Sequence, residues 1–386
     1  MIGVLVAVAL GLPGLATAAH LGLLTLGSLF YRDAEPGANE EIRFLILVPA
    51  HNEELVIARC LEAIEADRRR RDLVLVVADR CTDATAEIAT RFGAIVLERG
   101  PDSEPGRAAA RQAGLERARS LEWDAVVMLD ADSVVLPGFF AGCETALAGG
   151  ADAVQARSES EPGSTLATEA ALLAFTLQGV TVPRGRDRLG LSVRLRGTGM
   201  AIRRELVLAH RFGAPASEDL VFSLDLLLDG VRCRHVDSSR LRSEGVSRWD
   251  SFGGQKLRYE AGRMAAARTY VPKLLRRSVR HRDPACLEAA WFLATPPFAL
   301  AALSLLAAAG TAALVSCWWL AAVFGAGLVT LALVLATGLI QAGAGARSWL
   351  ALAAAPWYLV WKAAVQARAI ASVLRRDDYY PPTERV

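Results

Sequence analysis

The sequence predicts an α/β domain built on a mostly parallel, doubly wound sheet, with apolar helices before and after it. Between residues 43 and 130, short apolar runs alternate with amphipathic segments, as expected of βαβ units. Residues 1–30 contain no Asp, Glu, Lys or Arg and residues 286–361 contain almost none, so the charge lies between these two blocks. At 386 residues and 53% hydrophobic, the chain is long and apolar for one soluble domain.

The strands and helices of the central domain follow one another regularly. We expect strands at 43–49, 73–78, 94–98 and 125–130, because each is a short, nearly continuous apolar run. Helices are expected between them, at 54–67, 84–92 and 106–120, and later in the chain at 164–178 and 255–268. In such sheets ligands bind beyond the carboxyl ends of the strands, where this sequence places polar motifs.

Charge and cysteine usage exclude several classes of protein. The net charge of +2 gives no reason to expect a nucleic-acid partner. The six cysteines form no CxxC pair and have no regular spacing, which argues against a disulfide framework or a zinc site. A reducing cytosol therefore suits the central domain.

The apolar block at 1–30 is long enough to cross a bilayer. A cleaved signal peptide is the alternative, because residues 16–19 are small. No positive region precedes them, however, and the apolar run continues to Phe30, so we expect an uncleaved transmembrane anchor. Arginines follow from Arg32 onward, which predicts a cytoplasmic central domain.

The second apolar block predicts further membrane helices. Segments 287–309 and 312–341 can each span, whereas the last helix, 348–374, either spans with its polar face against protein or lies in the membrane interface. The expected organisation is an anchor at 1–30, an α/β domain at 31–243, interfacial helices at 244–285, membrane helices at 286–374 and a tail at 375–386. The predicted location is a bacterial plasma membrane.

Two carboxylates, Asp130 and Asp132, directly follow the apolar run 125–129. Carboxylate oxygens suit Mg²⁺ or Mn²⁺, which proteins hold with one or two carboxylates and the phosphates of a substrate. A pair of solvated turn aspartates is the alternative.

The order of further motifs along the chain favours a metal-binding role for Asp130 and Asp132 over solvated turn residues. The motifs are VPAHNEE at 48–54, ADRCTDAT at 78–85, GRAAARQ at 106–112, GTG at 197–199, SED at 217–219 and QKLRY at 255–259. In this order they resemble family 2 glycosyltransferases with the GT-A fold. The similarity is greatest to the membrane-integrated branch that contains cellulose, chitin and hyaluronan synthases and ceramide glucosyltransferase-like enzymes. It covers residues 43–260 and the flanking membrane segments.

The resemblance implies roles for individual residues. Asp219 would be the general base for the acceptor hydroxyl, with Glu218 beside it, and Arg258 would reach the diphosphate leaving group. Asp130 and Asp132 would bind the metal and, through it, the donor. Arg107 stands where the family usually has lysine, and Tyr259 where it has tryptophan. The remaining donor-binding residues would be Pro49, Glu53, Asp79, Asp83 and Gln255, and the acceptor-binding residues Gly197, Thr198, Gly199 and Tyr259.

Structural roles compete with some of these assignments. Ser217 could cap a helix whose first turn carries Glu218 and Asp219, since acidic groups are favourable there. Asp79 and Asp83 could cap the helix that follows them. Arg258 could belong to a helix on the membrane surface.

We therefore expect an inverting glycosyltransferase that moves a sugar from a nucleotide-diphosphate donor, with UDP expected, to a membrane-associated acceptor. The product would be a polysaccharide or a glycolipid. The alternatives are a single-transfer enzyme acting on a ceramide, hopanoid or polyprenyl lipid, and a non-catalytic subunit that binds nucleotide sugar. Assembly as a homo-oligomer or with other polysaccharide-assembly proteins stays open.

Overall fold

The chain forms two compact units, which are described separately. The computed structural model describes residues 1–33, 41–160, 169, 172, 175–213, 217–243 and 249–375. The sheet unit consists of Arg32–Glu161 and Leu191–Glu244. The helical unit consists of Met1–Tyr31, Pro162–Gly190 and Gly245–Val386.

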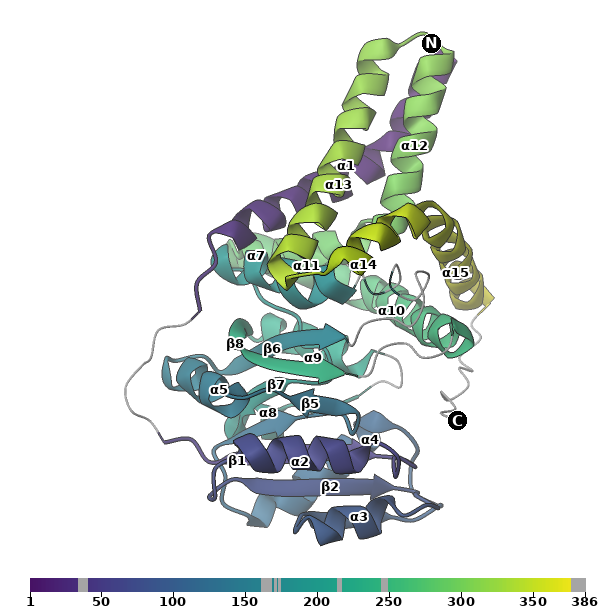
Figure 1. The fold of residues 1–386 in the computed structure, drawn as a ribbon. Helices are drawn as coiled ribbons and strands as arrows, with labels where there is room; N and C mark the ends of the chain where they lie inside the picture. The colour runs from purple at the N-terminus through teal and green to yellow at the C-terminus, as the bar shows by residue number, and fades with distance from the viewer. Residues whose placement is uncertain are drawn as a thin grey trace. The chain divides into compact units, whose positions relative to one another are not determined.

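The sheet unit contains one eight-stranded sheet in the order β3-β2-β1-β4-β7-β6-β8-β5 (Figure 1). The first four strands in this order are parallel, whereas β7 is antiparallel to β4 and β6, and β5 to β8. The predicted mostly parallel α/β sheet is confirmed. The strands are β1 (Phe44–Ala50), β2 (Leu73–Asp79), β3 (Ile95–Arg99), β4 (Ala125–Met128), β5 (Ser133–Val135), β6 (Ala153–Ser160), β7 (Met200–Arg203) and β8 (Arg234–Ser243).

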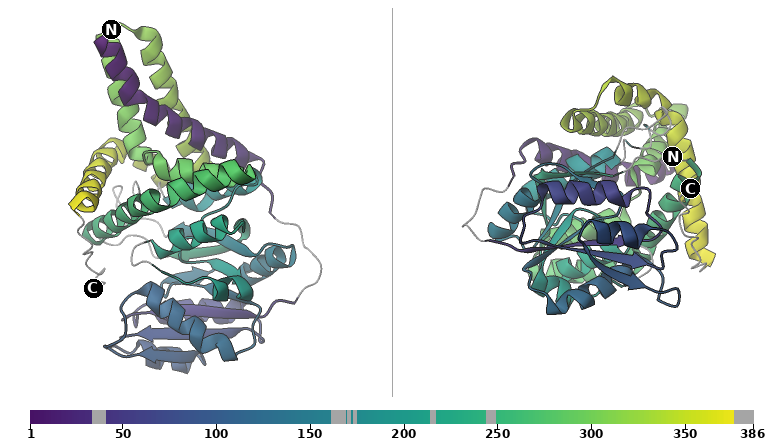
Figure 2. Two further views of the ribbon diagram at one scale, coloured as in Figure 1. Left: turned by 180° about the vertical axis from the view of Figure 1, so that it is seen from behind. Right: turned by 60° about the horizontal axis from the view of Figure 1, so that its bottom comes forward.

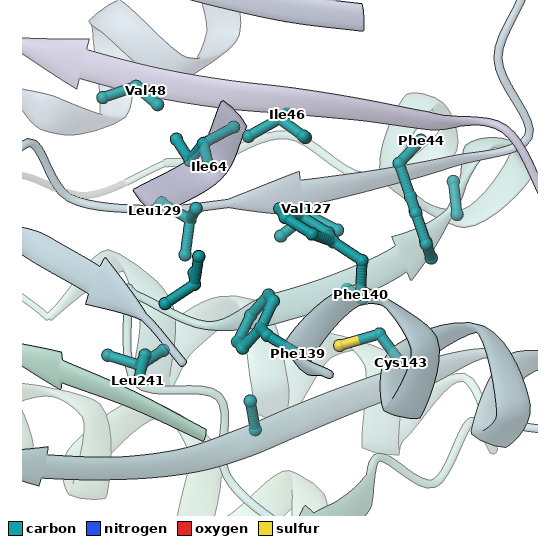
Figure 3. Close-up of a cluster of buried hydrophobic side chains, with 14 of the residues drawn as sticks. Phe44, Ile46, Val48, Ile64, Val127, Leu129, Phe139, Phe140, Cys143 and Leu241 are labelled. Atoms are coloured by element: carbon teal, nitrogen blue, oxygen red, sulfur yellow. The ribbon is translucent and has the colours of Figure 1, made fainter. Parts of the chain in front are cut away.

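Helices cover both faces of this sheet. Side chains alternate along a strand, so Phe44, Ile46 and Val48 of β1 enter one core and its Leu45 and Leu47 enter the other. In the first core these side chains lie near Phe139, Phe140 and Cys143 of α5 (Figure 3). The helices are α2 (Ile57–Asp67), α3 (Thr85–Arg91), α4 (Arg107–Arg117), α5 (Phe139–Ala148), α8 (Arg204–Ala209) and α9 (Glu218–Leu228).

The helical unit is built around a long first helix. Small residues let its neighbours approach, because a Cβ at Gly11 would collide with Phe324 and one at Gly14 with Leu305. The predicted helix at 164–178 lies largely outside the described residues. The helices are α1 (Ile2–Leu29), η2 (Leu177–Thr181), α7 (Val182–Arg188), α10 (Trp249–His281), α11 (Pro284–Ala294), α12 (Phe298–Leu314), α13 (Trp318–Ala342), α14 (Ala346–Leu350), η3 (Ala351–Ala354) and α15 (Ala355–Arg375). Figure 2 shows α1, in purple, beside green helices of the same unit, and α12 and α13 both contact it.

Within the described residues, α1 and α13 are each long and apolar enough to cross a membrane. The expected continuous segment 287–309 is instead broken, and α11 and α12 meet at an angle of 67°. Pro296 and Pro297 explain the break, because proline lacks an amide hydrogen and disfavours helix in the preceding residue. Whether α15 spans stays a prediction; its Lys362 Nζ lies 2.8 Å from Glu260 Oε1 of α10.

Candidate active site in the sheet unit

The polar motifs lie at one edge of the parallel half of the sheet. Strands β2, β1 and β4 are parallel neighbours, so their carboxyl ends meet at this edge. Asp79 ends β2, Pro49 lies near the end of β1, and Asp130 follows β4 closely. Strand β4 ends at Met128 rather than at 130, because the chain turns there and Ser133 N donates to Asp130 O.

Asp130 is held by two arginines and a threonine. Its Oδ2 lies 3.2 Å from Arg107 Nη1 and its Oδ1 lies 3.3 Å from Arg111 Nη2. Its backbone N–H donates to Thr198 Oγ1, which lies 2.8 Å from Ser133 Oγ. The central residue of the predicted GTG motif therefore supports the aspartate turn.

Arg111 is a site residue to which the sequence motifs assigned no role. Its side chain is fully buried and donates to Gly197 O at 2.6 Å and to Glu218 Oε1 at 3.2 Å, besides contacting Asp130. Burial lowers the pKa of Arg111, and the nearby Asp130 opposes that shift. The sequence signal is its spacing, because a residue four positions after Arg107 on α4 lies on the same helix face.

Asp219 converges on the same point from α9. A methyl group added to Gly197 would lie 3.5 Å from each of Arg107 Nη1, Arg111 Nη2 and Asp219 Oδ2. Gly197 has a φ of +82°, which favours glycine. Two arginines and the predicted base thus surround one backbone position.

The Asp219 carboxyl has a raised proton affinity but is mostly ionised at neutral pH. Burial, with the neighbouring Glu218 charge, raises its pKa to about 6. The Leu220 N–H, which donates to Asp219 Oδ1 at 2.8 Å, and Arg111 and Arg107 act in the opposite direction. A general base works best when its pKa lies near the operating pH, so this environment suits the predicted role.

The start of α9 is not held by a side-chain cap. Ser217 occupies the N-cap position, but its side chain makes no capping hydrogen bond, and its φ is +61°. A non-glycine residue in this region is uncommon and costs about 1–3 kcal/mol of strain. The alternative in which Ser217 acts as a helix cap is therefore not what the geometry favours.

The β1 and β2 loops are bound to each other. Asp83 Oδ1 accepts from Thr85, and its Oδ2 accepts from Glu54 N. Burial raises the pKa of Asp83, but these hydrogen bonds outweigh it and leave the pKa lowered. The Glu53 N–H donates to Thr85 Oγ1. Asp83 thus links the two loops, whereas the N-cap residue of α3 is Ala84, and the predicted role of Asp83 toward the donor stays a prediction.

Asp79 is buried and paired. Its Oδ1 lies 2.6 Å from Arg99 Nη1, and its Oδ2 lies 3.6 Å from Arg80 Nε. Its contact with a nucleotide base stays a prediction. In such a contact the Asp79 carboxylate would bind the base while it is also paired with arginine.

The predicted residues Gln255, Arg258 and Tyr259 belong to α10 in the helical unit. The side chains of Gln255 and Arg258 lie outside the described part of the structure. Tyr259 is 38% exposed. Their roles toward donor and acceptor stay predictions. Gly199, also predicted for the acceptor, packs so tightly that a Cβ there would collide with Leu241.

The comparison with known families identifies the family of this chain. A sequence profile described as glycosyltransferase like family 2 matches residues 42–262, more than half of the chain. The chain belongs to this family. It is therefore a glycosyltransferase that uses a nucleotide sugar. No curated protein sequence matches the chain.

Solved structures place the family member in the GT-A fold. A mannosyltransferase from Pyrobaculum calidifontis, in complex with GDP-Man and Mn²⁺, matches with a TM-score of 0.53 at 20% identity. The match covers 88% of this chain and 98% of the mannosyltransferase chain. Glucosyl-3-phosphoglycerate synthase from Mycobacterium tuberculosis, solved with Mn²⁺, UDP and phosphoglyceric acid, has a TM-score of 0.43 at 21% identity. That match covers 63% of this chain and 86% of the synthase.

The donor set of this glycosyltransferase fits a divalent cation that a substrate helps to hold. The pKa of Arg107 is raised mainly by Asp130, while burial opposes the shift and Glu218, Asp132 and Asp219 add to it. Four carboxylates thus act on one guanidinium. Among the described residues, however, no three His, Cys, Asp or Glu side chains are grouped to hold an ion. Asp130 and Asp132 would therefore need phosphate oxygens to complete an octahedral shell.

Proposed function

We propose that this chain is a membrane-bound, inverting glycosyltransferase that uses a nucleotide-diphosphate sugar, with UDP as the expected nucleotide. The acceptor would be membrane-associated and the product a polysaccharide or a glycolipid. One observation carries the proposal: Arg107, Arg111 and Asp219 converge around Gly197, next to the Asp130 carboxylate. This arrangement supports the proposal, because the carboxylate that would act as the base lies beside the groups that would bind phosphate and metal.

The donor diphosphate would occupy the side of the site that holds the aspartate pair. Asp130 and Asp132 would hold Mg²⁺ or Mn²⁺, which supplies charge stabilisation to the departing phosphates. Solved neighbours carry Mn²⁺ with UDP or GDP-Man, which supports this choice. The Arg107 side chain is 48% exposed, so it can turn from Asp130 to a phosphate at little cost.

The acceptor hydroxyl would lose its proton to Asp219. A hydroxyl is a weak nucleophile, and a carboxylate within hydrogen-bond reach makes attack on the sugar carbon possible. Glu218 raises the proton affinity of Asp219, and Arg111 holds Glu218 in place. With the base and the leaving diphosphate on opposite sides of the sugar carbon, one displacement inverts that centre. The negative charge on the diphosphate would be met by Arg107 and, from α10, by Arg258.

The membrane assignment rests on the apolar helices. Helices α1 and α13 are long and apolar enough to span, which supports an acceptor carried by the bilayer. We place the sheet unit on the cytoplasmic face of a bacterial plasma membrane, where nucleotide sugars are available. A single transfer to a lipid and repeated transfer to a polymer are both compatible with this site.

Membranes that contain the protein, incubated with a panel of labelled UDP- and GDP-sugars, test the proposal. We expect one donor to label a membrane-bound product, and the size of that product separates one added sugar from a ladder. Asp219→Asn should lower transfer by at least about a hundredfold, as loss of a general base does, while donor binding survives. A product that forms equally well with the variant would remove Asp219 as the base. Donor binding without any product would favour the non-catalytic subunit.

A further inference from the structure

The second half of α10 carries a surface that the transfer reaction does not use. Residues 261–281 contain six Arg or Lys side chains and no Asp or Glu. Arg263 is buried and donates to backbone carbonyls of α11, so it belongs to the packing. The side chains of Lys273, Arg276 and Arg280 are instead exposed. No described acidic side chain pairs with these three cations.

The exposed face of this helix has two rows. Leu275 and Val279, 42% and 82% exposed, are four residues apart and form an apolar row. Arg276 and Arg280, each directly after one of these apolar residues, form a second row parallel to the first. Lys273 precedes Arg276 by three residues, so it lies next to this basic row on the helix surface. The opposite face is buried through Tyr270, Leu274 and Ser278. The helix thus has a packed face and a face that is half apolar and half basic.

The position of this surface in the chain indicates its partner. Asp283 caps the start of α11, which forms with α12 a bent pair apolar enough to be a broken membrane span. The basic row therefore ends within a few residues of an apolar segment. A helix with such neighbouring apolar and basic rows suits the membrane interface, where aliphatic side chains enter the acyl boundary and arginines meet phosphates.

We propose that Lys273, Arg276 and Arg280 bind the phosphates of anionic lipids, while Leu275 and Val279 insert beside them. The partner is thus a negatively charged bilayer surface. Neither the transfer reaction nor insertion of the apolar helices requires that negative charge. The inference rests on the membrane association proposed above. Each cation near an anionic surface contributes about fivefold in lipid affinity, and salt screens the effect.

Spin-label spectroscopy on the full chain tests the inference. The protein is reconstituted in phosphatidylcholine with a trace of spin-labelled phosphatidylglycerol or of spin-labelled phosphatidylcholine, and the motionally restricted fraction of each label is measured. We expect phosphatidylglycerol to be enriched about two- to fivefold at the wild-type protein, because the measured value averages over all restricted lipids and only a few of them contact the three cations. The enrichment should vanish in about 1 M salt, where screening is nearly complete beyond a few ångströms.

Matched variants locate the effect. Lys273→Gln, Arg276→Gln and Arg280→Gln together should bring the enrichment close to unity. Arg91→Gln, Arg117→Gln and Arg119→Gln remove the same charge from exposed positions of the sheet unit and should leave it unchanged. The inference is overturned if the α10 variant keeps the wild-type enrichment, or if the wild type shows none while still restricting phosphatidylcholine. Absence of any restricted lipid would instead overturn the membrane association itself. Melting curves check that each variant is folded.

Discussion

Charged side chains are paired differently in the two units. In the helical unit, Glu288 Oε1 lies 2.8 Å from His20 Nε2 and 2.7 Å from Arg186 Nη2, so one carboxylate is matched by groups from α1 and α7. In the sheet unit, four carboxylates act on Arg107. In the first arrangement the charged groups are paired within the cluster, which links α1, α7 and α11. The second is rich in negative charge at a strand edge, and it leaves Asp219 with a raised pKa of about 6.

This difference teaches how to tell a structural charge from a reactive one. A buried ion pair with matched partners is expected to affect folding when it is broken. A group whose proton affinity is shifted by burial and by like charge is expected to affect chemistry. The predictions below separate the two by measuring stability and transfer on the same variants.

The largest effect on stability is expected for Arg111→Met. The variant leaves Asp130, Glu218 and the Gly197 carbonyl without their buried guanidinium, which costs about 3–5 kcal/mol of unfolding free energy. Arg107→Met is the matched control on the same helix face, and it should cost under about 1 kcal/mol because that side chain is half exposed. Both should lose transfer. Denaturant unfolding measures the difference, and equal stability of the two variants would contradict it.

A smaller loss of stability is expected for Glu288→Gln. The amide keeps a hydrogen-bonding group beside Arg186 and His20 but removes the charge, so we expect a cost of roughly 1–3 kcal/mol. Binding of UDP and GDP should stay at the wild-type level, because this cluster lies in the helical unit. Loss of nucleotide binding by a variant that is still folded would show that the distinction between the units is wrong.

The pH dependence should identify Asp219 directly. Transfer should fall as pH drops through about 6, because protonated Asp219 cannot accept the hydroxyl proton. Glu218→Gln removes a charge that raises the pKa of Asp219, so the acid limb should move to lower pH. A pH profile of kcat/KM measures both curves. An acid limb that stays in place in the variant would mean that another group controls it.

The raised pKa of Asp219 also predicts how stability depends on pH. Stability should fall as pH rises, whereas transfer should increase. The folded pKa of this carboxyl lies above its unfolded value of 3.8, so ionised Asp219 destabilises the fold progressively as pH rises from about 4 to 6, and fully above that. Asp219→Asn should therefore raise stability at pH 8 by on the order of 1 kcal/mol. Melting at pH 8 and at pH 4 checks this, with the gain expected only at pH 8.

The smallest effect is expected for Asp83→Asn. Its carboxylate accepts hydrogen bonds from Thr85 and Glu54 N, and the amide retains an acceptor oxygen. We expect a loss of about 0.5–1.5 kcal/mol and less than a threefold change in nucleotide affinity. Calorimetry with UDP and GDP checks the second part. A large loss of affinity at unchanged stability would instead show that Asp83 contacts the donor directly.

The parallel half of the sheet could be predicted because each of its strands is a contiguous apolar run. The antiparallel half gave no such signal. Strand β8 reads RHVDSSRLRS, and its buried His235 and Ser239 are polar, so hydropathy does not distinguish it from a loop. The site was predictable where motifs follow strand ends. The contacts of Arg111 and Thr198 were not, since they depend on segments 86 and 68 residues away along the chain.

The central claim is that the strand-edge carboxylates bind a nucleotide diphosphate through a divalent cation. Titration calorimetry of UDP and GDP with the full-length protein, in Mn²⁺ and in EDTA, tests it on the wild type, Asp132→Asn and Asp219→Asn. We expect one nucleotide to bind the wild type and Asp219→Asn only when Mn²⁺ is present, and Asp132→Asn to lose most of that binding. Equal binding in EDTA, or by Asp132→Asn, would contradict the claim.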